Sequence, residues 1–500
     1  MHRGDRRFVL LGALLVLGLA AAHMLRFPVV VDDAFISLRA ARNWVTTGWP
    51  EYNPGVREWV PTPFAWVALL ALVQAVTHLP LPPVAQVLGA AAGLLTVILP
   101  VLLLPTSRRV AFFAAVGCAA SSAWAAWPLS GMESSFFALL VSASMLFVMR
   151  YMDSLRRRDA VISGLLCGLA VATRLDGVSF VPAGLLAVAS ARRPKDLGWF
   201  ALAFLAAALP ALLFLQIVFG TVLPNSYYAK VHGFANLASG RAHVLGFARM
   251  MRLEVWFPVL LLPLLVPALR RKLLVLCVAV GAWTGWVMVE GGDFMAYHRF
   301  LHPIWPLVTL AFALGLVAAE DRLAAWRPAL RPTWRWLVLL VAALAAGSWA
   351  VPSFRGAELR RYKDFAVEEG TRTAIGRWFA GRYPASEWMA VKPAGIIPYY
   401  SGMRAVDFFC LVDGKAARTG EWVEGGWIGH QRMNAARIHE IGPKIVILEP
   451  RLFPLDELPP PGATDPNHGK TWIVHPDAAR YRAVRAEILP GQYLNYFERL

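Results

Sequence analysis

Long apolar runs separated by short arginine-rich clusters dominate this chain of 500 residues. A helix needs about 20 mostly apolar residues to cross a bilayer, and a chain with many such runs has few other folds open to it. Charged residues make up only 16% of the chain, against roughly 25% in soluble proteins. We expect apolar spans near residues 8–27, 61–79, 83–104, 110–127, 133–152, 160–173, 177–190, 198–219, 254–269, 273–290, 300–318 and 336–350. The sequence therefore predicts a polytopic α-helical membrane protein.

The net charge of +17 is concentrated in short clusters between the apolar runs, near residues 156–158, 192–195, 270–272 and 322–335. Basic clusters in short loops favour the cytoplasmic side, so this excess reflects membrane topology and excludes nucleic acid as the expected partner. A cytoplasmic N-terminus and an external C-terminus require an odd number of spans. We expect about 11 transmembrane helices, with one segment between 61 and 127 re-entrant or merged with its neighbour. The first run is expected to be an uncleaved anchor, although a signal peptide is an alternative.

The composition changes near residue 351, where charges become frequent and the apolar segments become short. Residues 387–391, 404–409 and 444–448 are predicted strands, and residues 364–383 are a predicted amphipathic helix. We therefore divide the chain into a transmembrane domain, 1–350, and an extracytoplasmic α/β domain, 351–500.

Asp32 and Asp33 follow the first apolar run directly, on the predicted outer side of the membrane. Charges beside a span are costly and tend to mark function. Successive helical residues point about 100° apart, so the two carboxylates are expected to have different roles. One would cap a helix starting near Ala34, and the other, for which Asp32 is the preferred candidate, would act as general base. Alternatively, both aspartates cap the helix and face solvent.

Two basic clusters on the predicted outer side are not explained by topology: Lys230 with His232, and His298 with Arg299. Cations at this surface suit an anionic phosphate, to which they donate charge-assisted hydrogen bonds. The alternative is contact with lipid headgroups. We predict that these four residues bind the phosphate of a lipid-linked donor.

Other polar residues at the outer ends of the predicted spans are candidates for substrate binding. In the transmembrane part they are Arg39, Glu133, Arg174, Asp176, Asn225, Tyr227, Tyr228 and Asp293. In the C-terminal part they are Lys392, Asp407 and His430. A structural Arg174–Asp176 interaction and ordinary loop positions for the C-terminal three are the alternatives. No metal ligand is assigned, since these cations can neutralise a phosphate themselves, and a divalent cation would be an addition rather than a requirement.

Several catalytic sequence motifs are absent. The chain contains no Walker lysine loop, no HExxH and no GxSxG. Its four cysteines are scattered, without disulfide or zinc spacing. An activated donor would therefore have to arrive already in the membrane.

Six short segments carry a family resemblance: residues 32–36, 62–66, 131–134, 173–177, 223–230 and 291–295. In this order they resemble the GT-C superfamily of glycosyltransferases that use polyprenyl-phosphate sugars. Within it, the last two matching segments look most like the mycobacterial terminal arabinofuranosyltransferase B family and its bacterial relatives. Ala296 stands where a proline is expected after Met295, which departs from that pattern.

The resemblance implies a bacterial plasma-membrane enzyme with an extracytoplasmic C-terminal cap. It implies inverting transfer of a sugar, such as arabinofuranose, from a polyprenyl-phosphate donor to a cell-envelope glycan or glycolipid, with the aspartates as catalytic groups. The alternative class is a transporter or flippase of lipid-linked or anionic solutes, which should show inverted repeats that this sequence lacks. A third hypothesis is a non-catalytic relative whose active site has been lost.

Overall fold

The computed structural model describes residues 3–104, 108–231, 235–423, 429–458 and 479–500, with side chains described from residue 9 onward. Its contacts divide the chain into two compact units that do not follow the sequence order. Unit 1 comprises Met1–Pro28, Ala85–Ala211 and Gly233–Arg361, and unit 2 comprises Val29–Val84, Leu212–His232 and Tyr362–Leu500. Three separate stretches of chain thus build each unit. The predicted division at residue 350 stays a prediction, and the contact units cut the chain differently.

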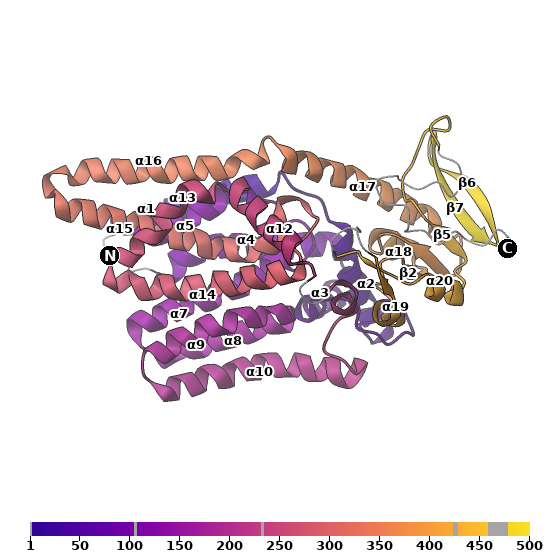
Figure 1. Ribbon diagram of the computed structural model, residues 1–500, viewed down its shortest axis with the longest axis horizontal. Helices are drawn as coiled ribbons and strands as arrows, with labels where there is room; N and C mark the ends of the chain where they lie inside the picture. Colours follow the sequence, from indigo (N-terminus) through magenta and orange to yellow (C-terminus); the bar gives the residue numbers. More distant parts are fainter. Residues whose placement is uncertain (1–2, 105–107, 232–234, 424–428, 459–478) are drawn as a thin grey trace. The chain divides into compact units, whose positions relative to one another are not determined.

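Unit 1 is helical throughout the part that the structure describes (Figure 1). Its longer helices are α1 (Arg3–Met24), most of α4 (Leu81–Leu103), α5 (Arg108–Ala120), α7 (Ser134–Ser154), α8 (Arg157–Thr173), α9 (Val181–Ser190), most of α10 (Pro194–Phe219), α12 (Leu237–Met250), α14 (Pro267–Glu290), α15 (Trp305–Trp326) and α16 (Arg331–Ala350). The shorter helical segments are α6 (Ser122–Ala125), η2 (Leu175–Phe180), α13 (Leu253–Leu261), η3 (Leu262–Leu265), η4 (Ala296–Ile304), η5 (Pro328–Leu330) and η6 (Val351–Ser353).

Six helices in the described residues are long and apolar enough to cross a membrane, and four shorter helices are also apolar. The polytopic helical fold is therefore confirmed, with six to ten apolar helices rather than the expected eleven spans. Two predicted spans account for part of the difference. The run at 110–127 is divided between α5 and α6, and the helix over the run at 160–173 begins with the charged residues Arg157, Arg158 and Asp159.

Helix α15 forms the centre of unit 1, and every residue from Trp305 to Ala318 is buried. Trp305 and Phe312 of this helix both pack edge-on against Trp349 of α16, with ring centroids 5.1 and 5.0 Å apart. Elsewhere, α8 approaches α10 closely through Gly164 and Gly168. A Cβ at either glycine would lie 2.3 Å from a backbone carbonyl oxygen of α10, so only glycine permits this contact.

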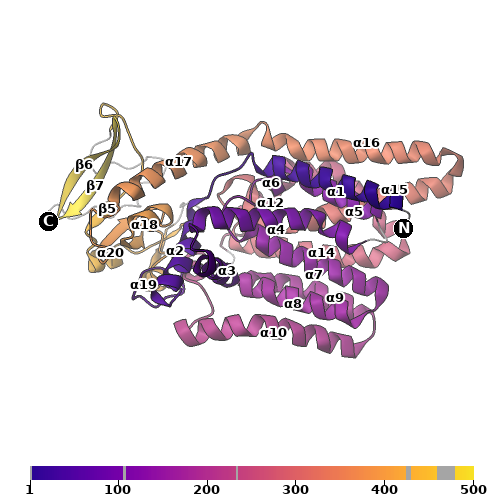
Figure 2. The same cartoon turned by 180° about the vertical axis from the view of Figure 1, so that it is seen from behind.

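Unit 2 combines helices with a mixed sheet, and Figure 2 shows the same elements from behind. Its helices are α2 (Asp32–Thr47), α3 (Phe64–Thr77), α11 (Asn225–Lys230), most of α17 (Ala357–Phe379), α18 (Ile396–Ser401), α19 (Gly414–Thr419) and α20 (Ala435–Ile441). Its strands are β1 (Trp388–Val391), β2 (Arg404–Asp407), β3 (Glu421–Trp422), β4 (Arg432–Met433), β5 (Ile445–Ile447), β6 (Tyr481–Leu489) and β7 (Gln492–Arg499).

The main sheet has the order β2-β1-β5-β7-β6. Strands β2, β1 and β5 are parallel, with Ala390 opposite both Val406 and Val446, whereas β7 pairs antiparallel with β5 and β6. The three predicted strands are confirmed, and they form this parallel core because their continuous apolar runs suit a sheet covered on both faces. The predicted amphipathic helix corresponds to α17, which begins at Ala357.

Candidate functional site

The aspartate pair lies in the first turn of α2, which begins at Asp32. Val31 is the N-cap residue and has no side-chain oxygen, so the prediction that one aspartate caps this helix is wrong. The carboxylate of Glu369 takes part of that role instead, because its Oε1 accepts the backbone N–H of Asp32 at 2.9 Å. Both aspartates still benefit from the positive end of the helix dipole.

Asp32 is buried, with 4% of its surface exposed, and its carboxylate binds the segment before α18. Its Oδ2 accepts the backbone N–H of Gly395 and its Oδ1 accepts that of Ile396, both at 2.8 Å. Burial raises the pKa of Asp32, while nearby Arg372 and the two N–H donors oppose that increase. These contacts give Asp32 an anchoring role in unit 2.

Gly395 is required for this anchor because it lies almost in contact with Asp32. A Cβ at residue 395 would lie 1.9 Å from the backbone oxygen of Asp32 and 2.5 Å from its Oδ2. No side chain fits at such distances. The backbone of residue 395 can therefore reach the carboxylate only as glycine.

Asp33 differs from its neighbour, because its side chain is only half-buried. The two adjacent carboxylates therefore have different environments. Asp32 was the preferred candidate for the base, but it is the more buried of the two. Asp32 is held by backbone donors, whereas Asp33 has access to solvent.

Arg39 and Arg42 join α2 to α18 and the residues that follow it. The Arg39 guanidinium donates to the carbonyl oxygens of Tyr52 at 2.7 Å and Met403 at 2.6 Å, and also to that of Pro398. Arg42 donates to the carbonyl oxygen of Tyr399 at 2.9 Å. Arg39, predicted to bind substrate, is fully buried and holds the backbone of unit 2 together.

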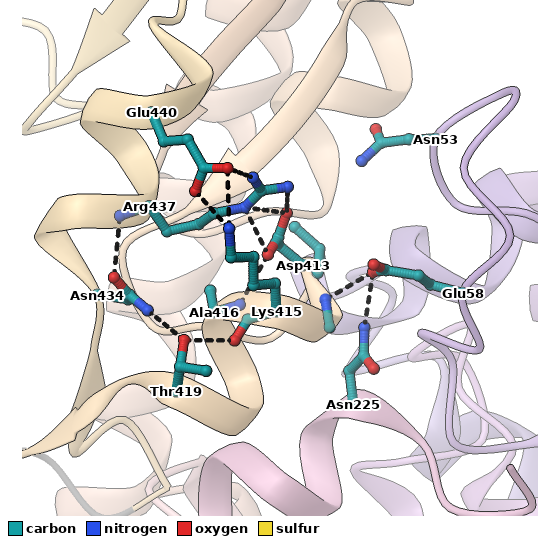
Figure 3. A network of polar contacts seen from close by, with 12 residues as sticks. Asn53, Glu58, Asn225, Asp413, Lys415, Ala416, Thr419, Asn434, Arg437 and Glu440 are labelled. Atoms are coloured by element: carbon teal, nitrogen blue, oxygen red, sulfur yellow. Dashed lines mark hydrogen bonds and ion pairs between the residues drawn. The ribbon is translucent and has the colours of Figure 1, made fainter.

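A second polar cluster joins α11 to the start of α19 (Figure 3). Glu58 Oε2 accepts the backbone N–H of Gly414 at 2.6 Å and the side-chain amide of Asn225 at 3.3 Å. Burial raises the pKa of Glu58, and these donors oppose that increase. Asn225 was a predicted substrate ligand, and in this structure it is buried against Glu58.

Beside it, Asp413 caps α19 and pairs with α20 (Figure 3). Its Oδ1 accepts the backbone N–H of Ala416 at 2.7 Å, and its carboxylate pairs with Arg437 at 3.0 Å. Arg437 also pairs with Glu440, which in turn binds Lys415 at 2.8 Å. This chain of alternating charges is a structural brace for the short helices of unit 2.

Lys230 ends α11 and is half-buried. An added Cβ at Gly429 would lie 3.9 Å from Lys230 Nζ, which places the ammonium beside residues 429–430. His430 is buried there, with its ring 4.5 Å from that of Phe409. Two predicted site residues, Lys230 and His430, therefore come from distant parts of the sequence to one region of unit 2. His232 lies outside the described residues.

The other predicted residues of unit 2 lie elsewhere in it. Tyr227 and Tyr228 pack edge-on with ring centroids 5.6 Å apart, and Arg418 covers Tyr228 at 4.5 Å. Lys392 is buried, 3.9 Å from Glu449. Asp407 accepts the backbone N–H groups of residues 409, 411 and 412, and burial raises its pKa to about 6. Asp407 therefore shapes a loop after β2.

In unit 1, Arg174 forms a buried network with two predicted partners. It pairs with Glu133 and with Asp176, each at 2.7 Å. The sequence had left open a structural Arg174–Asp176 interaction, and this interaction is present. Phe300 lies between two guanidinium groups, 5.7 Å from that of Arg174 and 4.9 Å from that of Arg299.

Arg299 pairs with Asp293 at 2.7 Å, and both side chains are almost completely buried. This cation, predicted to bind phosphate, is therefore already neutralised by a carboxylate. His298 lies against His243, with their Nδ1 atoms 3.4 Å apart. Gly292 allows this arrangement, since it has φ of +83° and its added Cβ would lie 2.5 Å from His243.

Sequence reasoning missed several residues that hold the candidate site in unit 2, above all Glu58, Glu369, Arg372 and Gly395. Glu58 had a usable signal, a carboxylate in the same segment between the first two apolar runs as the aspartate pair, whereas the others lie in an ordinary amphipathic helix or loop. Among the described residues, no group of three or more His, Cys, Asp or Glu is arranged to hold a metal ion.

The chain shares its fold with ArnT from Cupriavidus metallidurans. The match to ArnT bound to undecaprenyl phosphate has a TM-score of 0.52 and 15% identity, covering 81% of this chain and 86% of ArnT. The match to the apo state has a TM-score of 0.53 and 14% identity, with the same coverage. The oligosaccharyltransferase of Archaeoglobus fulgidus matches with a TM-score of 0.47 and 12% identity, over 87% of this chain and 69% of that protein.

In sequence, a family described as a domain of unknown function (DUF8728) matches residues 358–494. No curated protein matches the chain. The structural similarity defines the class of fold: the chain is a multi-pass helical protein with the GT-C-like fold of ArnT. The closer resemblance to the terminal arabinofuranosyltransferase B family stays a prediction.

Proposed function

We propose that this chain is a membrane glycosyltransferase that uses a polyprenyl-phosphate-linked sugar. The GT-C-like fold supports this class, and so does the undecaprenyl phosphate bound to the ArnT structure that this chain resembles. We propose arabinofuranose as the sugar and a cell-envelope glycan or glycolipid as the acceptor, because the sequence resemblance implies both.

The observation that carries the mechanism is the unequal environment of the aspartate pair. A general base must accept a proton from the acceptor hydroxyl, so its carboxylate needs access to substrate. Both oxygens of Asp32 already accept backbone N–H groups, and the residue is buried. We therefore assign the base to the half-buried Asp33 and make Asp32 the positioning residue that holds the first turn of α2, a reversal of the assignment preferred from sequence.

In the proposed reaction the acceptor oxygen attacks the anomeric carbon while its proton passes to Asp33. The bond between that carbon and the phosphate oxygen breaks, and the polyprenyl phosphate leaves with both bonding electrons. Lys230 is the preferred cation for the leaving phosphate, because Arg299 is already paired with Asp293. A single displacement inverts the anomeric configuration.

The test uses purified full-length protein with a panel of polyprenyl-phosphate sugars that includes arabinofuranose, mannose and glucose. Asp33→Asn should lower kcat by about 10²–10⁴-fold, as expected for loss of a general base, with an unchanged melting temperature. Asp364→Asn, at an exposed position on α17, is the matched control and should retain activity.

Full activity of Asp33→Asn would refute the assignment of the base. If wild type transferred no sugar from any donor but moved a lipid-linked solute across vesicles, the enzyme proposal itself would be wrong and a transporter would take its place.

A further inference from the structure

Unit 1 contains a cavity of about 620 Å³ between α1, α4, α5, α15 and α16. Its volume falls within the range of about 300–1,000 Å³ typical of small-molecule sites. Most of its lining is apolar, including Val16, Ile98, Phe112 and Leu339. Phe112 and Leu339 are exposed apolar residues within this lining, so the cavity offers an apolar surface that nothing else in the described residues covers.

Two small residues of α1 create the space on one side of this cavity. Gly12 and Ala13 both line it, and an added Cβ at Gly12 would lie only 3.2 Å from the ring of Phe112. A longer side chain at either position would enter the cavity. Phe112 thus packs closely over Gly12, and the apolar slot that these residues line beside Ala13 suits a slender group such as an acyl chain.

Arginines line the same cavity. Arg108, Arg109 and Arg335 all contribute to the lining, together with Glu320. Glu320 is buried and pairs with Arg109 at 2.8 Å and with Arg335 at 3.2 Å, which fixes both guanidinium groups. Arg109 also pairs with Asp321 at 3.0 Å. Among the side chains that the structure describes, these three guanidinium groups and the carboxylates of Glu320 and Asp321 leave an excess of one positive charge.

These arginines lie at the end of unit 1 that carries the basic stretch 322–335. Helix α5 begins at Arg108, and α16 begins at Arg331, shortly after α15 ends at Trp326. Both views place the N-terminal end of α1 at this same end of unit 1 (Figures 1 and 2). By the distribution of basic residues this is the predicted cytoplasmic side, which faces an anionic leaflet.

We propose that this cavity binds an anionic phospholipid of the cytoplasmic leaflet. One acyl chain lies along Gly12, Ala13 and Phe112, and the phosphate accepts hydrogen bonds from Arg108 and Arg335. A headgroup with one net negative charge balances the single excess positive charge, whereas a zwitterionic headgroup does not. The proposal does not depend on the proposed transfer reaction, which involves other residues.

The test measures lipid binding to the purified full-length protein by native mass spectrometry. The probes are phosphatidylglycerol and phosphatidylcholine with identical acyl chains, and undecaprenyl phosphate. Wild type should bind phosphatidylglycerol more tightly than phosphatidylcholine. Arg108→Gln and Arg335→Gln should each weaken phosphatidylglycerol binding about fivefold, the effect expected of one basic residue beside an anionic lipid. Arg108→Lys should retain most of it.

Ala13→Phe should fill the slot and abolish binding of both phospholipids. Arg331→Gln is the matched control, because Arg331 lies one turn before Arg335 on α16 but does not line the cavity, and it should bind as wild type does. Equal binding of the two phospholipids to wild type would overturn the proposal, as would phosphatidylglycerol binding that none of the cavity variants changes. Tighter binding of undecaprenyl phosphate than of phosphatidylglycerol would overturn it in favour of a carrier-lipid site.

Discussion

Replacing Gly395 by alanine tests the anchor that holds the aspartate pair in place. The new Cβ would lie 1.9 Å from the backbone oxygen of Asp32 and 2.5 Å from its Oδ2, so the 395–396 segment has to move. That movement breaks two hydrogen bonds of 2.8 Å from backbone N–H groups to the Asp32 carboxylate. Hydrogen bonds to a charged group are worth about 1.5–3 kcal/mol each, so the loss is about 3–6 kcal/mol.

A loss of that size should lower the melting temperature by at least roughly 6 °C in a unit of this size. Sugar transfer should fall as well, because Asp33 follows Asp32 directly on the first turn of α2. The assays are thermal unfolding of the purified protein, followed by intrinsic fluorescence, and the initial rate of sugar transfer.

Gly370→Ala is the matched control, on α17 in the same unit. Nothing lies within 4 Å of a Cβ added there, so alanine should stabilise the helix by about 0.5–1 kcal/mol and leave activity unchanged. If Gly395→Ala melted at the same temperature as wild type and transferred sugar at the same rate, Asp32 would not be an anchor and the division of roles between the aspartates would fail.

Three further changes test other parts of the structure. Burial raises the pKa of Asp407 to about 6, so the folded state binds its proton more tightly than the unfolded state. The resulting stabilisation is fully present below about pH 4 and is lost as the pH rises through 6, which lowers the free energy of unfolding by about 3 kcal/mol. Urea unfolding should show a smaller decrease for Asp407→Asn than for wild type over that interval. Arg174→Gln removes the cation that neutralises the buried carboxylate of Glu133, so unit 1 should lose about 3–5 kcal/mol of stability. A melting temperature equal to that of wild type would show that this ion pair does not stabilise the unit. Gly292→Ala places a Cβ 2.5 Å from His243 and should destabilise the 291–299 loop, measured as faster hydrogen exchange there; unchanged exchange would exclude the close contact.

Local sequence patterns predicted the elements but not every boundary between them. The apolar runs identified the membrane-type helices, because burial in lipid or in a helical core requires the same continuous apolar composition. The strands at residues 388–391, 404–407 and 445–447 were also recognisable, since buried parallel strands are short apolar runs. The sequence indicated one irregular segment between 61 and 127, but it did not place the break between α5 and α6, because periodicity alone does not reveal where a run of small residues interrupts helical hydrogen bonding.

In the candidate site, too, the sequence identified some residues but not the contacts that set their roles. Position along the chain was enough to single out Asp32 and Asp33, and it also suggested that their roles differ. It did not reveal which aspartate is anchored, because the groups that decide this, Glu369 and Gly395, lie 337 and 363 residues away in the sequence. Likewise, the charge of Arg299 was visible in the sequence, but its neutralisation by Asp293 depends on a turn through two glycines with positive φ.

The sequence by itself thus determined the class of protein, a polytopic membrane chain with an α/β C-terminal region, because composition and periodicity follow from the solvent that each residue meets. It also singled out the acidic pair that directly follows the first apolar run. Only the tertiary structure decided which carboxylate is held by backbone donors, which cations are already paired, and where an apolar cavity meets arginines. Those properties depend on contacts between residues far apart in the chain, which no local pattern records.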